Sequence, residues 1–197
     1  MNKSKESFAA PVVVLSAICL VVALALAFTY KVANPIIIRN NEAVAVAARQ
    51  QILPAADAFT MVEGIEPASS TDGKAAVTEV YSADNGSGYV MTVETTSFGG
   101  VLTMMVGIDA EGALTGVKVT EHADTPGVGT KDMDPGYLGQ YSGLTALTSA
   151  GNVKKEAAQL ASGGTFEYIS GASVSGQAIH SGVEAALSQY AAMGGAQ

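Results

Sequence analysis

Three serine hydroxyls, those of Ser170, Ser173 and Ser175, lie within six residues of one another near the C-terminal end of the chain. The first two are separated only by Gly171 and Ala172, which leave room for a bulky group to approach the backbone. Hydroxyl groups can donate hydrogen bonds to phosphate oxygens. The cluster therefore combines polar groups with space for a phosphate.

An amphipathic helix is predicted directly after this cluster. From Val174 onward, apolar and small residues recur every three to four positions, and this spacing predicts a helix to about Met193. The hydroxyls would then lie at the helix N-terminus, where free backbone N–H groups and the positive end of the helix dipole attract phosphate. A purely structural role for Ser173 as the N-cap residue accounts for the same pattern.

A second segment, residues 122–131 with the sequence HADTPGVGTK, decides between these interpretations. Together with Ser170–Ser173 it resembles the two signatures of the FMN-binding domain family, in the family's order, and the resemblance runs from about Gly88 to Tyr190. The resemblance implies that FMN is joined covalently, through a phosphodiester, to the last hydroxyl of the second signature, which is Ser173. It also implies that a flavin transferase attaches the FMN outside the cytoplasm.

Two positions depart from the family pattern. Ser173 stands where threonine is commoner, and a serine offers the same nucleophile with less steric hindrance. Glu167 stands where the family usually has aspartate, so a carboxylate that the transferase can use for recognition or proton removal is displaced by one methylene. Ser170 and Ser175 are alternative acceptors.

The first signature also has two interpretations. Thr125 to Gly129 fits a tight turn that leaves a strand. As part of a flavin site, Gly127 and Gly129 would let backbone amides approach the flat ring, while Pro126 keeps the loop rigid. The flanking His122 is a candidate ring contact.

Lys131 closes this segment and is the cation near the proposed ring site. It would stabilise a reduced, anionic flavin, although an exposed solubilising lysine fits equally well. The nearby carboxylates Asp132 and Asp134 are expected to be solvated rather than paired for acid–base chemistry.

Other chemistries lack the residues that they need. Cys19 is the only cysteine, and His122 and His180 are the only histidines, so we expect neither a metal site nor an iron–sulfur cluster. The chain contains no dinucleotide-binding fingerprint and no phosphate-binding P-loop, so we expect it not to bind NAD itself.

The N-terminal part of the chain predicts a membrane anchor. No charged residue occurs from Ser7 to Tyr30, and about 20 apolar residues suffice for a helix to cross a membrane. We therefore expect residues 8–30 to contact lipid. A cleaved signal peptide is the alternative, because Ala25-Leu26-Ala27 has the small-x-small form of a cleavage site.

The charge balance predicts on which side of the membrane the rest of the chain lies. Residues 40–197 hold six Lys/Arg against seventeen Asp/Glu, a net charge of −11, which suits neither an anionic cytoplasmic leaflet nor nucleic acid. The positive-inside bias of the flanking lysines and arginines is small. We expect a single-pass protein of the cytoplasmic membrane with its C-terminal domain outside the cytoplasm.

Hydropathy patterns predict an α+β protein, in which one domain with a twisted antiparallel sheet and flanking helices follows the transmembrane helix. Asn34-Pro35 should interrupt or end that helix, and Pro54 should end a second one. Alternation in the last strand predicts one buried face of the sheet. The expected helices are 36–53 and 153–161, one short helix is possible within 132–150, and the expected strands are 76–82, 89–95, 101–108 and 114–120.

These elements suggest three parts: an N-terminus with the transmembrane helix at 1–34, a connecting helix with the first part of the outer domain at 35–87, and the FMN-binding domain at 88–197. With the anchor, the chain resembles flavin-bearing subunits of Rnf ion-translocating ferredoxin:NAD oxidoreductase complexes and of sodium-translocating NADH:quinone reductases. This implies an electron carrier whose partners are other membrane subunits of an Rnf-like complex. The alternative is a non-redox surface protein, pilin-like or solute-binding.

Overall fold

The computed structural model describes residues 9–147 and 169–195, and the chain divides into two compact units, Met1–Ala45 and Val46–Gln197. A long helix, α1 (Ala9–Ile52), makes up the described part of the first unit. The most apolar stretch of this helix has a mean hydropathy of 2.9, and none of its residues is buried. The helix is therefore long and apolar enough to cross a membrane.

The expected interruption at Asn34-Pro35 is wrong, because α1 runs through Pro35 without a break. An interior proline costs one backbone hydrogen bond and a steric clash with the preceding turn, but this cost is local, and the helical residues on both sides of Pro35 continue the helix. The helix ends at Ile52, two residues before Pro54, as the sequence predicted.

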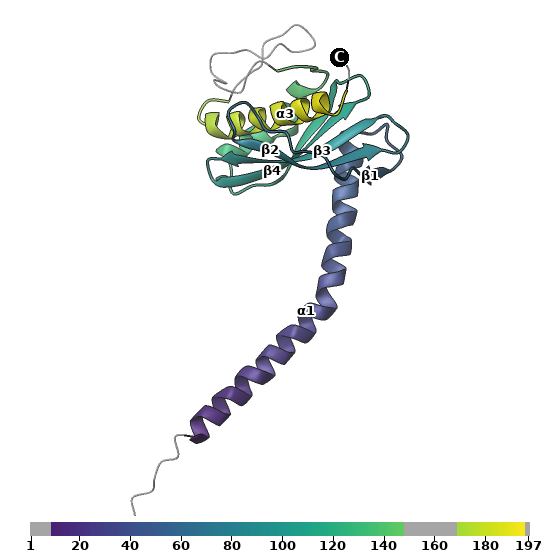
Figure 1. The fold of residues 1–197 in the computed structure, drawn as a ribbon. Coiled ribbons are helices and arrows are strands. Elements are labelled where there is room, and N and C mark those ends of the chain that lie inside the picture. The colour runs from purple at the N-terminus through teal and green to yellow at the C-terminus, as the bar shows by residue number, and fades with distance from the viewer. Residues whose placement is uncertain (1–8, 148–168, 196–197) are drawn as a thin grey trace, which may run out of the picture. The chain divides into compact units, whose positions relative to one another are not determined.

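A five-stranded antiparallel sheet forms the centre of the second unit, and each strand pairs with its neighbours along the chain in the order β1-β2-β3-β4-β5 (Figure 1). The four strands expected from the sequence are confirmed. A three-residue edge strand was not predicted, because three residues are too few to reveal alternation. The strands are β1 (Phe59–Met61), β2 (Ala75–Ala83), β3 (Gly88–Ser97), β4 (Gly100–Asp109) and β5 (Leu114–Glu121).

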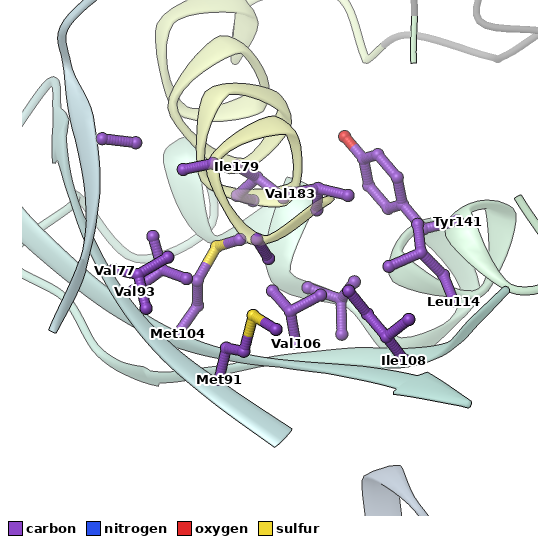
Figure 2. Close-up of a cluster of buried hydrophobic side chains, with 14 of the residues drawn as sticks. Val77, Met91, Val93, Met104, Val106, Ile108, Leu114, Tyr141, Ile179 and Val183 are labelled. Atoms are coloured by element: carbon purple, nitrogen blue, oxygen red, sulfur yellow. The ribbon is translucent and has the colours of Figure 1, made fainter. Parts of the chain in front are cut away.

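The C-terminal helix, α3 (Ser173–Ala192), lies across one face of this sheet (Figure 1). Its Ile179 and Val183 point into an apolar core between helix and strands (Figure 2). Gly182 lets the helix approach β4 closely, since a Cβ atom there would lie 2.5 Å from the terminal carbon of Met104. The strands contribute Val77, Met91, Val93, Met104, Val106, Ile108 and Leu114 to the core.

The opposite face of the sheet is covered by the last turns of α1. Ala48 and Ile52 are buried, and a Cβ atom at Gly107 would come within 2.4 Å of the Ile52 side chain. Arg49 lies over the ring of Tyr81 at 3.5 Å from its centroid. The prediction of one buried face is therefore incomplete, because the middle of β4 is buried on both faces.

Short helices connect β5 with the segment that precedes α3. They are η1 (Gly129–Met133), α2 (Pro135–Leu138) and η2 (Gly139–Tyr141), where the sequence indicated a loop with one short helix. Asp134 begins α2 by accepting a hydrogen bond from the backbone N–H of Gly136 at 2.9 Å. The helix expected at 153–161 lies outside the described residues.

Candidate functional site

Ser173 is the first residue of α3, and Ala172 occupies the N-cap position. No side chain caps this end of the helix, so the N-cap role considered for Ser173 is not the one it has. The turn before the helix depends on Gly171, whose φ of 92° is strained for residues with a side chain. Ser173 is half-buried and lies at the end of the helix where the first backbone N–H groups have no intrahelical partners.

A cavity of about 400 Å³ opens at this end of the helix, and it joins the two segments that the sequence singled out. One wall comes from the start of α3 and the other from the loop that follows β5, with a third contribution from the β3–β4 turn. The residues that line it are Phe98, Asp124, Thr125, Val128, Gly129, Gly171, Ala172, Ser173, Val174 and Ser175.

Six of the residues predicted from the sequence thus meet at one cavity, and five do not line it. Thr125 and Gly129 of the first segment lie there with Gly171, Ala172, Ser173 and Ser175 of the second. The other five residues are exposed to solvent and do not line the cavity; they are His122, Pro126, Gly127, Lys131 and Ser170.

Asp124 holds the three parts of the cavity together. Its carboxylate accepts hydrogen bonds from the Ser97 hydroxyl, from the backbone N–H of Gly99 at 2.6 Å and from the Ser175 hydroxyl. Burial raises the pKa of Asp124, but these hydrogen bonds and the nearby His122 outweigh burial and lower the pKa below the ordinary value. Asp124 is therefore a buried anion at neutral pH.

Asp132 is a second buried carboxyl group beneath the first turn of α3. Burial raises the pKa of Asp132 to about 6, and repulsion from Asp124 adds to this rise, while a hydrogen bond from the backbone N–H of Gly176 opposes it. Within the described part of the chain, its Oδ1 atom has no hydrogen-bond partner. The expectation that Asp132 is solvated is wrong, because η1 turns its side chain inward and leaves it 1% exposed.

The sequence did not predict the burial of Asp132 or four of the lining residues, which are Phe98, Asp124, Val128 and Val174. A weak signal existed for Asp124, which directly precedes Thr125 and Pro126 in the first segment. Phe98 carried no signal, because only the pairing of β4 with β5 brings the β3–β4 turn beside Asp124.

His180 belongs to the core and not to the cavity. It is 2% exposed, and its Nδ1 lies 3.3 Å from the hydroxyl oxygen of Tyr141. Across residues 9–147 and 169–195, no group of three or more His, Cys, Asp or Glu side chains is arranged to hold a metal ion.

The cavity fits a flat ligand that carries a phosphate. Its volume is typical of small-molecule sites. The first turn of α3 contains no acidic residue, so its dipole and free N–H groups favour an anion there. Gly129 keeps the cavity floor open, because a Cβ atom at this position would lie 2.7 Å from the Ser175 hydroxyl oxygen.

Comparison with known proteins shows the family to which the chain belongs. Residues 97–188, which include both signature segments, match the FMN-binding domain family. The G subunit of an ion-translocating oxidoreductase complex from Methanosarcina acetivorans is 31% identical over 156 residues, which are 75% of this chain and 76% of the relative. The chain belongs to the family of ion-translocating oxidoreductase complex G subunits.

A second relative in the same family is the G subunit of the Na(+)-translocating ferredoxin:NAD(+) oxidoreductase complex of Acetobacterium woodii. It is 30% identical over 186 residues, covering 90% of this chain and 88% of the relative. The crystal structure of NqrC from Shewanella oneidensis is 22% identical, with a TM-score of 0.42, over 59% of this chain and 62% of that one.

Family membership confirms the resemblance drawn from the two signature segments and sets aside the non-redox surface protein. The chain has an FMN-binding domain, and its apolar helix and its family identify it as a membrane protein.

Proposed function

We propose that this protein is a single-pass electron carrier of an ion-translocating ferredoxin:NAD oxidoreductase complex, with FMN joined to Ser173 by a phosphodiester. Its partners are the other membrane subunits of that complex, and residues 8–30 contact lipid. The domain lies outside the cytoplasm, where a flavin transferase loads it.

The observation that carries the proposal is the different placement of the three candidate hydroxyls. Ser170 is exposed and does not line the cavity. Ser175 lines it but is 2% exposed, and its hydroxyl is engaged by Asp124. Ser173 alone of the three is both on the cavity wall and accessible, at the helix end that favours a phosphate.

The attachment step is a phosphoryl transfer to Ser173. Ser173 Oγ attacks the phosphorus of an FMN donor that carries a leaving group on its phosphate. The new Oγ–P bond forms as the bond to the leaving group breaks, and a base of the transferase takes the hydroxyl proton. The product is a phosphodiester with one negative charge, which the N-terminus of α3 stabilises.

Once bound, FMN supplies the electron-transfer chemistry, while the protein supplies position and electrostatics. The loop that ends in Gly129 and the first turn of α3 form the walls of the cavity. Phe98, Val128 and Val174 add apolar surface to the lining of the cavity. The buried Asp124 keeps the walls together and places a fixed negative charge beneath them.

The decisive experiment compares serine variants of the full chain, each co-expressed with a flavin transferase. We expect Ser173→Ala to lack the flavin fluorescence that the wild-type band keeps on a denaturing gel, and Ser173→Thr to retain it. Ser170→Ala and Ser175→Ala are the matched controls and should stay fluorescent. Flavin retained by Ser173→Ala, with loss in either control, would show that the acceptor is wrong.

A further inference from the structure

Three exposed apolar side chains gather around the cavity. Phe98 is 78% exposed, and Val128 and Val174 are each 50% exposed, yet all three line the same space. They come from the β3–β4 turn, the loop after β5 and the first turn of α3. Apolar side chains grouped in this way around a concave site are typical of ligand-binding surfaces.

The turn that carries Phe98 is held on both sides. Phe98 and Gly99 are the two residues between the paired ends of β3 and β4. Asp124 accepts hydrogen bonds from the Ser97 hydroxyl and the Gly99 N–H, the groups directly before and after Phe98. The turn is also tightly packed, since a Cβ atom at Gly99 would lie 2.2 Å from the carbonyl oxygen of Ala123.

The Asp124 carboxylate also accepts a hydrogen bond from the helix that carries the attachment site. The Ser175 hydroxyl, two residues after Ser173, donates to Asp124. One buried side chain thus fixes the position of the Phe98 turn relative to the Ser173 turn. Because the turn that carries Phe98 is already held in place, little backbone freedom is lost when a planar ligand binds against this residue.

We infer that Phe98 contacts the isoalloxazine ring of FMN and that Asp124 is the residue that positions it. The inference rests on attachment of FMN at Ser173, because a flavin tethered there has its ring within reach of the cavity that Phe98 lines. Offset stacking or edge-to-face packing of the two rings covers apolar surface that is otherwise in contact with water.

Replacement of Phe98 by tryptophan tests the contact, because an indole that touches a flavin quenches its fluorescence by electron transfer. Full-length Phe98→Trp protein with attached FMN should fluoresce several-fold less per flavin than wild type when folded. In denaturant, the two should become equal. Val101→Trp is the matched control, since Val101 is 61% exposed on neighbouring β4 but does not line the cavity. We expect little quenching there.

The positioning role of Asp124 is tested in the Phe98→Trp background. Adding Asp124→Asn should restore part of the fluorescence while FMN stays attached, because the turn is no longer held by a carboxylate with two acceptor oxygens. Thermal unfolding monitored by circular dichroism identifies any variant that is merely unfolded. If Asp124→Asn is unfolded, Ser97→Ala takes its place. This variant removes a single hydrogen bond to Asp124 and should give a smaller increase in flavin fluorescence.

Equal folded-state fluorescence of Phe98→Trp and Val101→Trp, each with FMN attached, would overturn the ring contact and leave the proposed function intact. Unchanged quenching in both Asp124→Asn and Ser97→Ala would overturn the positioning role alone. Absence of attached flavin from the wild-type chain would overturn the proposed function and this inference together.

Discussion

The carboxyl group of Asp132 lies against the backbone of Gly176, where a Cβ atom would come within 2.8 Å of the Asp132 Oδ2 atom. The first turn of α3 therefore approaches η1 as closely as it does only because residue 176 has no side chain. Asp132 accepts the Gly176 N–H but shares this buried region with the anionic Asp124. In this environment the protonated form of the Asp132 carboxyl group is favoured more than it is in water.

Stability should accordingly depend on the titration of Asp132. Its pKa is raised from 3.8 to about 6 in the folded chain, so its favourable contribution is complete below about pH 4 and is lost as the pH rises through 6. Asp132→Asn, which stays neutral, should raise the free energy of unfolding at pH 8 by up to about 3 kcal/mol, the equivalent of this pKa shift. The gain should disappear near pH 4.

Thermal unfolding of both proteins in detergent between pH 4 and 8 measures this difference. Asp72 and Asp124 have lowered pKa values, so their stabilisation is lost only as the pH falls below about 4, and it is lost from both proteins. A stability difference that is the same at pH 4 and pH 8 would contradict the titration of Asp132.

Gly127 and Gly129 should respond differently to substitution, although they are two residues apart. Gly127 has a φ of 75° and open space around it, so Gly127→Ala should cost about 1 kcal/mol of stability through backbone strain and leave the cavity intact. Gly129→Ala would place its Cβ atom 2.7 Å from the Ser175 hydroxyl oxygen and 3.0 Å from the Asp124 Cβ. It should narrow the cavity and disturb the Asp124 hydrogen bonds.

Flavin content and midpoint potential, measured together in the two variants, separate the effects. We expect Gly127→Ala to leave the flavin content and the midpoint potential unchanged. Gly129→Ala should shift the midpoint potential or the flavin absorption spectrum. The different expectation for Gly127 follows because Gly127 does not line the cavity. A shifted potential in Gly127→Ala alone would be the opposite result.

The proposed topology is tested by reporters fused after Gln197. The net charge of −11 over residues 40–197 does not suit an anionic cytoplasmic surface. An alkaline phosphatase fused at this end should therefore be active. A green fluorescent protein fused at the same end should be exported and should not fluoresce. A second fusion after Lys5, before the apolar helix, should give the reverse pattern. Identical signals from both ends would contradict a single span.

The sequence by itself determined the elements with a regular pattern. Strand-favouring runs separated by turn residues predicted β2 to β5, and apolar residues at helical spacing predicted α3, because these patterns are local to each element. Two short motifs indicated the flavin site and the proposed acceptor serine. The edge strand β1 and the continuity of α1 through Pro35 were not predicted, since pairing and neighbouring propensity decided them.

Only the tertiary structure decided the roles of single polar groups. Asp124 and Asp132 are both charged residues in a polar stretch of sequence, and nothing local predicts their burial at 4% and 1% exposure. Their environment is made by Ser97 and Gly99 from one turn and by Ser175 and Gly176 from a helix far along the chain. Burial and hydrogen bonding are properties of the whole assembly of segments, so the pKa values of both groups and the distinction between Ser173 and its neighbouring hydroxyls arise only on folding.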